Sequence, residues 1–236
     1  MPSTTGFRRE AIKAVLFDLD DTLWPIAPTI IRAEALQYEW LTVNAPATVA
    51  QHSRESMRAR RMVLAQTDPR FRFDLWSLRH TALCEALVAA GEDPLLADAA
   101  MEIFSRERNV VCVYEDVVPG LTRLAQHFTL GTISNGFADL AAIGLAEHFH
   151  TSIAAHRLGF AKPDRRIFRQ ACEAMQILPH EAIYVGDDPL LDVEGAQKAG
   201  MRTVWMNRFE RALSPEVMPD FHCANLQELG SWLGCP

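Results

Sequence analysis

The stretch that decides the fold is Val15-Leu16-Phe17-Asp18-Leu19-Asp20-Asp21-Thr22-Leu23. Its first part is an apolar run of the kind that forms a strand buried on both faces of a parallel sheet. The run stops abruptly at three carboxylates and a threonine. Three acids within four positions repel one another, and a cation or a reactive phosphoryl group would offset that repulsion. The stretch therefore predicts a buried strand that leads into a site for such a group.

The composition fits an ordinary globular protein with an acidic surface. The chain has 236 residues and a formal net charge of -7, enough for one large domain or a core with a smaller one. A net negative charge argues against nucleic acid as a partner. The five scattered cysteines include no CxxC pair, which argues against a disulfide framework and favours the cytoplasm. We find no signal peptide and no apolar run that could span a membrane.

The sequence between residues 24 and 112 has the periodicity of helices. Apolar residues recur three and four positions apart over 30–41, 75–87 and 95–103, and the basic segment 49–64 is also predicted to be helical. No strand signal occurs in this part of the sequence. We therefore expect an all-helical domain, residues 24–112, inserted after the first strand.

Strands and helices alternate after residue 113. Apolar runs predict strands at 128–133, 151–154, 182–185 and 201–205. Helices are expected from Phe137 towards Gly144, from Lys162 onwards, between the later strands, and over 225–233. This order predicts a doubly wound, Rossmann-like α/β core with a parallel sheet, formed by residues 1–23 and 113–236. Residues 1–11 are polar, and we expect them to be frayed or loosely docked.

Polar residues follow the predicted strands where a parallel sheet binds its ligands, beyond the carboxyl ends. They are the acids after strand one, Ser134-Asn135, and the loop Gly186-Asp187-Asp188-Pro189-Leu190-Leu191-Asp192. Lys162 stands at the start of a helix, from which a long side chain can reach the same edge. Carboxylates, a hydroxyl, an amide and an ammonium group are thus predicted to meet at one rim.

These groups suit phosphoryl transfer. A carboxylate such as Asp18 can attack phosphorus, and a second carboxyl group two residues on, Asp20, can serve as acid and base. Mg²⁺ prefers oxygen ligands and would offset the repulsion between the attacking and attacked anions. A serine hydroxyl, nearby backbone amides and a lysine can hold the phosphoryl oxygens where charge spreads.

The chain resembles the haloacid dehalogenase (HAD) superfamily in its phosphatase branch. The resemblance covers about residues 13–206, and the helical insert is similar to the type-one (C1) cap of that family. Four motifs carry it, in order: Asp18-x-Asp20-x-Thr22, Ser134, Lys162 and Gly186-Asp187-Asp188-x-x-x-Asp192.

The resemblance implies a role for each of these residues. Asp18 would be the nucleophile and a magnesium ligand, and Asp20 the general acid and base, which also gives its backbone carbonyl to the metal. Lys162 would bridge Asp18 and phosphate. Thr22, Ser134 and Asn135 would support or bind the phosphoryl group. Asp187 would be a direct metal ligand, with Asp188 and Asp192 as indirect or water-mediated partners.

The implied function is magnesium-dependent hydrolysis of a small phosphomonoester through a phosphoaspartate. A sugar phosphate, a nucleotide monophosphate and a phosphoglycolate-like acid all remain open as substrates, and the enzyme is expected to be a monomer or homodimer. Dehalogenases of the superfamily lack an acid at the position of Asp20, which favours a phosphatase here. The alternatives are a phosphosugar mutase and a non-catalytic, phosphate-responsive binding module.

Structural explanations stand beside these functional ones. Each polar motif could simply cap a helix, as short polar side chains and proline often do. The eight histidines show no metal-binding spacing. A series of arginines in the insert would most simply form a solvated helix face, although one or two could bind an anionic leaving group. These are Arg54, Arg58, Arg60, Arg61, Arg70, Arg72 and Arg79.

Overall fold

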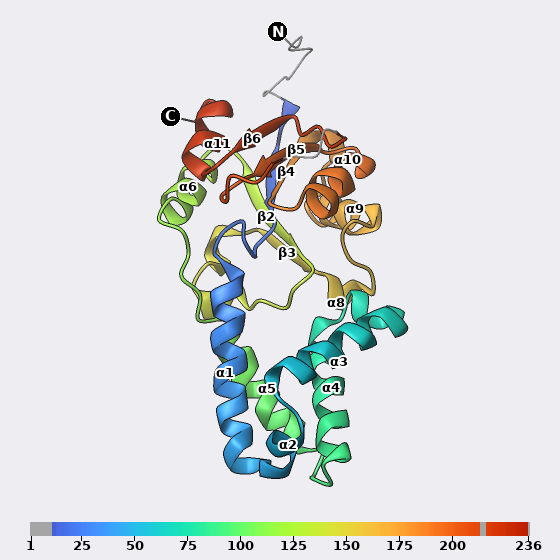
Figure 1. The fold of residues 1–236 in the computed structure, drawn as a ribbon. Helices are drawn as coiled ribbons and strands as arrows, with labels where there is room; N and C mark the ends of the chain where they lie inside the picture. The colour runs from blue at the N-terminus through green and yellow to red at the C-terminus, as the bar shows by residue number, and fades with distance from the viewer. Residues whose placement is uncertain (1–10, 213–215, 236) are drawn as a thin grey trace.

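A computed structural model describes residues 11–212 and 216–235 of the chain. Its centre is a parallel sheet of six strands in the order β3-β2-β1-β4-β5-β6 (Figure 1). The strands are β1 (Ala14–Phe17), β2 (Thr129–Ser134), β3 (Thr151–Ala154), β4 (Ala182–Gly186), β5 (Arg202–Met206) and β6 (Phe221–Cys223). The strand order reverses beside β1, so the first strand lies at the switch point where open α/β sheets bind ligands.

Helices cover both faces of the sheet, as the alternation of elements predicted. Val15 and Phe17 of β1 pack into one apolar core with α6 and α11, and Ala14 and Leu16 pack into another with α9 and α10. The bounds are α6 (Val117–Leu124), α9 (Arg165–Ala174), α10 (Gly195–Ala199) and α11 (Leu226–Trp232). Because β1 is buried on both faces, it has no polar side. The predicted doubly wound fold is confirmed.

The segment between β1 and β2 begins with five helices that form their own core. Figure 1 shows them gathered at the end of the molecule opposite β6 and α11, beyond the edge where β1 leads into α1. Buried Leu41, Leu87, Met101 and Phe104 belong to this separate core. The helices are α1 (Ile26–Asn44), α2 (Pro46–Gln51), α3 (Arg54–Thr67), α4 (Leu75–Ala89) and α5 (Leu96–Arg108), with a short turn η2 (Pro69–Arg72).

Several elements differ from the sequence prediction. The basic segment 49–64 contains parts of two helices, because the chain turns at His52 and Ser53 caps α3 by accepting the Ser56 N–H. The helix expected at Lys162 begins at Arg165, capped by Asp164. Strand β6 was not predicted. The expectation for residues 1–11 lies outside the described residues except at Ala11.

Short helical turns make up the remaining connections. The helix expected from Phe137 is only α7 (Leu140–Ile143), capped by Asp139. The other turns are η3 (Ala146–His148), α8 (Ala155–Leu158), η4 (Pro179–Glu181) and η5 (Pro189–Glu194).

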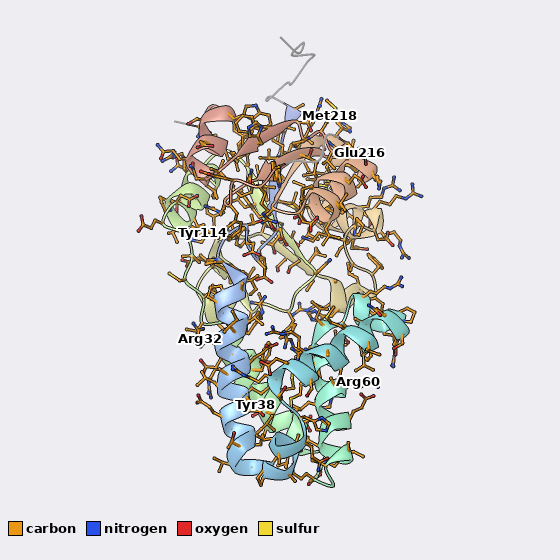
Figure 2. All side chains as sticks on the ribbon, viewed as in Figure 1. Arg32, Tyr38, Arg60, Tyr114, Glu216 and Met218 are labelled. Carbon is orange, nitrogen blue, oxygen red and sulfur yellow. The ribbon has the colours of Figure 1, made fainter. Side chains whose placement is uncertain are left out.

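The two connections between the sheet and the helical segment lie side by side. The Tyr114 N–H donates to the Leu23 carbonyl at 3.1 Å, so the outgoing and returning chains are hydrogen bonded. Figure 2 shows Tyr114 at the junction between the sheet and the helices. Arg208, from the loop after β5, donates to the Thr22 carbonyl at 2.6 Å and makes two bonds to Asp116. Among the described residues, none of the helices has both the length and the apolarity that a membrane span requires.

Candidate active site

Three neighbouring strands end at one edge of the sheet, and each continues into polar residues. Phe17 of β1 lies opposite Thr132 of β2 and opposite Val185 of β4. Asp18, Ser134 and Asp187 therefore lie at nearly the same height along the direction of the strands. This edge lies at the end of the sheet where the five helices gather (Figure 1). The convergence that the sequence predicted for these three loops is present.

Lys162 is the centre of a buried polar cluster at this edge. Its ammonium group donates to Asp18 Oδ1 and to Asp192 Oδ1, both at 2.6 Å. It also donates to the Tyr184 hydroxyl at 3.0 Å, and Tyr184 donates onwards to the Ile133 carbonyl at 2.9 Å. One buried cation thus holds two carboxylates that come from the loops after β1 and β4.

Asn135 fixes the backbone that carries this lysine. Its Nδ2 donates to the Lys162 carbonyl at 3.1 Å, and its Oδ1 accepts the Lys162 N–H at 2.8 Å. Both ends of the amide are used, so the end of β2 and the turn before α9 are joined. The sequence placed Asn135 at the phosphoryl group, and the structure shows its side chain positioning Lys162.

Burial and mutual repulsion set the protonation of the acids. Burial raises the pKa of Asp18 well above its ordinary value, Lys162 opposes this, and Asp192 and Asp20 add to it. Burial by itself would lower the pKa of Lys162, but Asp18 and Asp192 together raise it. Burial and Asp192 raise the pKa of Asp187 to about 6 against the hydrogen bond from Arg211. A further cation among these acids would favour their ionised forms.

The acids at this edge fit a magnesium ion. Asp18, Asp187 and Asp192 each offer an oxygen, and these atoms lie within 4.8 Å of one another. Oxygen donors of this kind are what Mg²⁺ prefers. Asp192 is also bound to Lys162 and accepts the Asp188 N–H at 2.9 Å. Asp187 accepts a hydrogen bond from Arg211 at 2.8 Å on Oδ2.

Asp20 lies beside the cluster and is held by two other side chains. Trp24 Nε1 donates to Asp20 Oδ1 at 2.8 Å, and Arg108 Nη2 donates to Oδ1 at 3.0 Å and to Oδ2 at 2.9 Å. A Cβ at Gly136 would lie 3.1 Å from Asp20 Oδ2, 3.2 Å from Arg108 Nη2 and 3.3 Å from Ser134 Oγ. The loop after β1, the end of α5 and the end of β2 therefore meet at Gly136.

Three other predicted residues use their polar atoms in local structure or leave them unpaired. Thr22 is fully buried, and its hydroxyl has no hydrogen-bond partner among the residues that the structure describes. The Asp188 carboxylate caps η5 by accepting the N–H groups of Leu190 and Leu191 at 2.8 and 2.9 Å. Ser134 Oγ accepts the Gly136 N–H at 2.9 Å, which shapes the turn after β2.

Sequence reasoning missed Arg108 and Arg211, which contact predicted acids, and Tyr184, which contacts Lys162. Arg108 and Arg211 come from segments that showed no motif, so nothing in the sequence distinguished them from surface arginines. Tyr184 carried a usable signal, because a hydroxyl in the middle of a buried apolar strand needs a polar partner.

The arginines of the helical segment mostly pair with acids of that segment. Arg58, Arg61 and Arg79 all donate to the buried Glu34, at distances between 2.5 and 2.9 Å. Arg60 pairs with Glu85. Arg79 also lies 4.1 Å from the ring centroid of Phe104. These contacts hold α1, α3 and α4 together.

Comparisons with known proteins agree with this geometry. A family model described as haloacid dehalogenase-like hydrolase matches residues 12–200. Phosphoserine phosphatase of Thermus thermophilus is 32% identical over 92% of this chain and 98% of its own. Glyceraldehyde 3-phosphate phosphatase of Methanopyrus kandleri is 31% identical over 92% and 95%.

A solved structure agrees over nearly the whole fold. The crystal structure titled 2-haloacid dehalogenase from Pseudomonas syringae pv. tomato superposes with a TM-score of 0.89 at 40% identity. The match covers 94% of this chain and 98% of that one. The family model covers strands β1 to β4 and the helical segment, and the resemblance read from the motifs is confirmed. The chain belongs to the haloacid dehalogenase-like hydrolase family, and the protein is a hydrolase of that family.

Proposed function

We propose that the protein is a magnesium-dependent phosphatase that hydrolyses a small phosphomonoester through a phosphoaspartate formed on Asp18. The observation that carries the proposal is the pair of carboxyl groups at the end of β1. Asp18 is hydrogen bonded to Lys162 beside further acids. Asp20 lies at the same edge of the sheet, close to Ser134. A nucleophile and a separate proton donor, beside an oxygen-rich metal site, are what this reaction needs.

The first step would transfer the phosphoryl group to the enzyme. An oxygen of Asp18 attacks phosphorus, the ester P–O bond breaks, and Asp20 gives its proton to the departing alkoxide. Lys162 and the Ser134 hydroxyl would hold the phosphoryl oxygens on which negative charge increases. Asp192 keeps the Lys162 ammonium group aimed at Asp18 through its own 2.6 Å contact.

The second step would release phosphate and restore the enzyme. Asp20, now ionised, takes a proton from water, and the water oxygen attacks phosphorus while the bond to Asp18 breaks. Asp18 and Asp187 are the residues that would hold a magnesium ion, together with the backbone carbonyl of Asp20 that the family resemblance implies. When bound, the ion would supply positive charge that offsets the repulsion between the nucleophile and the phosphoryl group.

The activities for which the relatives are named support a small phosphomonoester as the substrate. Two relatives that cover more than nine-tenths of this chain are named as phosphatases of phosphoserine and of glyceraldehyde 3-phosphate. We extend that class, a small phosphorylated metabolite, to this protein. The proposal includes closure of residues 24–112 over the site as a cap. It also includes a cytoplasmic location, which five scattered cysteines without a CxxC pair favour.

Dehalogenation is the second candidate, because the 2-haloacid dehalogenase from Pseudomonas syringae is 40% identical. Displacement of a halide also uses a carboxylate nucleophile, but a halide leaves without a proton. Asp20 would then have no leaving group to protonate. The ordered Asp20 beside Ser134 therefore favours the phosphatase.

The test measures phosphate release from an aryl phosphate and a panel of metabolite esters, with magnesium and with a chelator. Asp18→Asn should lower turnover by about three orders of magnitude or more, because it removes the nucleophile. Chloride release from 2-chloropropionate is measured in parallel. Wild-type rates in Asp18→Asn, or halide release without phosphatase activity, would contradict the proposal.

A further inference from the structure

Three arginines of the helical segment share a single acid. Arg61 and Arg79 donate to Glu34 Oε1 at 2.5 and 2.9 Å, and Arg58 donates to Oε2 at 2.6 Å. The side chain of Glu34 is 7% exposed, that of Arg61 15% and that of Arg79 17%. Within the described part of the chain, Glu34 is the one acid to which these three arginines are hydrogen bonded. The cluster therefore carries more positive charge than its one carboxylate balances.

Burial and mutual repulsion act against this surplus charge. Burial and the charge of Arg79 lower the pKa of Arg61 to about 10, although Glu34 opposes them. Burial also lowers the pKa of Arg79; Glu34 opposes this, and Arg58 adds to it. Burial by itself would raise the pKa of Glu34, but the three arginines lower it, so this acid is already ionised. An added anion would relieve the repulsion that remains.

The same four side chains line a cavity of about 480 Å³ between α1 and the pair formed by α3 and α4. Apolar side chains complete the lining, among them Ile30 and Ile31 of α1, Met62 of α3 and Leu78 of α4. Figure 1 shows α1 facing α3 and α4 across the helical segment. A cavity of this size, with apolar walls and a few charged groups, is typical of sites for small molecules.

Most N–H donors of the arginines are left for a ligand. A guanidinium group carries several N–H donors in one plane, and each of the three arginines uses one nitrogen on Glu34. The remaining donors fit carboxylate or phosphate oxygens, which accept N–H groups in pairs. Arg79 also lies 4.1 Å from the Phe104 ring centroid, so this guanidinium group is positioned before any ligand binds.

We propose that Arg58, Arg61 and Arg79 form a binding site for a small organic dianion, such as a dicarboxylate, within the helical segment. Two charges on the ligand match the excess of the arginines over Glu34, and the apolar walls contact its carbon chain. The same chemistry serves either a charged group of the substrate or a separate effector. Binding of the anion does not depend on the proposed phosphatase function.

The experiment measures binding of the dicarboxylates from malonate to adipate by calorimetry, in low-salt buffer without phosphate. We expect a dicarboxylate to bind and uncharged glutaramide not to bind. Arg79→Met should weaken binding by about 10- to 100-fold, the usual value of a charged hydrogen bond. The matched control is Arg60→Met, which changes the net charge equally but removes the exposed pair with Glu85. Equal affinities in these two variants, or no binding of any dicarboxylate to the wild type, would overturn the proposal.

Glu34→Gln distinguishes an anion site from a cluster that only joins helices. It removes the resident negative charge and keeps the shape, so the affinity for the dicarboxylate should rise about 10-fold even though the protein loses its ion pairs. Unchanged or weaker binding would contradict the proposal.

Inhibition of aryl phosphate hydrolysis then identifies the source of the anion. Competition with the ester that Arg79→Met abolishes would indicate a charged group of the substrate. A change in kcat without competition would indicate a separate effector, and both outcomes support the site.

Discussion

Single residues at this site carry charge that the fold by itself does not balance. Asp18, Asp187 and Asp192 approach one another within 4.8 Å, and Lys162 contacts two of them. Within residues 11–212 and 216–235, the one ion pair that Asp187 makes is with the partly exposed Arg211. The pKa of Asp187 is raised to about 6 because burial and Asp192 outweigh that arginine.

Asp187 should make the metal-free protein less stable as the pH rises. The pKa of Asp187 increases from 3.8 to about 6 on folding, so the folded state binds the proton more tightly. The stabilising effect of that proton is complete below about pH 4 and is lost between about pH 4 and 6, for a total of ~3 kcal/mol. Asp187→Asn removes this titration.

The measurement is urea unfolding of both proteins from pH 4 to 7 in chelator. As the pH rises across this range, the free energy of unfolding of the wild type should fall relative to that of Asp187→Asn. The same pH dependence in both proteins would contradict the raised pKa of Asp187. Magnesium would bind the ionised Asp187 carboxylate. The affinity of the wild type for magnesium, measured by calorimetry, should therefore weaken below about pH 6.

Elements bring these residues together through the ends of strands. Gly186, the last residue of β4, allows Asp192 to fold back over the strand end. A Cβ at this position would lie 2.4 Å from Asp192 Cγ and Oδ2. The loop after β4 therefore depends on a glycine for the position of a carboxylate that holds Lys162.

Gly186→Ala should displace Asp192 and loosen its bond to Lys162. We expect a loss of about 1–3 kcal/mol in unfolding free energy from the steric conflict, together with a lower kcat. Thermal unfolding and steady-state kinetics measure the two effects. Gly230→Ala in α11 is the control, because a Cβ there would meet no atom closer than 3.3 Å. Equal losses of stability and of kcat in the two variants would show that Gly186 is not needed to make room for Asp192.

Elements with a continuous pattern could be predicted, and contacts between distant segments could not. The apolar run before Asp18 and the alternation after residue 113 were enough for the parallel sheet. Three-residue β6 has too short a pattern to be distinguished from a loop. Arg108 and Arg211 reach the acids only because of how the chain packs, which periodicity does not encode. Thr22 and Asp188 matched motif positions, but their contacts depend on local turns.

At the scale of the whole molecule, Arg208 ties the sheet to both connections of the helical segment. It bonds the Thr22 carbonyl on the outgoing side and Asp116 on the returning side, and it lies 4.0 Å from the Tyr114 ring centroid. Its side chain is 6% exposed, so these contacts are largely shielded from water. Motion of the helices relative to the sheet must act through this junction.

Arg208→Met should loosen that junction. We expect a loss of about 2–3 kcal/mol, because Asp116 keeps its charge in a half-buried place without its partner. Amide hydrogen exchange should accelerate over residues 20–26 and 110–118 and stay unchanged in α3 and α4. Arg202→Met, which removes the exposed pair with Asp220, is the control. Uniform acceleration over the chain would indicate general destabilisation and contradict a local role.

The hydrogen bond between Tyr114 and Leu23 has an evolutionary consequence. Since the five helices leave and rejoin the sheet at adjacent points, the unit between them can be lengthened, shortened or exchanged without moving any strand. Selection can then alter which molecule is recognised while the bond-breaking groups on the sheet stay as they are. Proteins with this connectivity can acquire new substrates through changes in the helical segment alone.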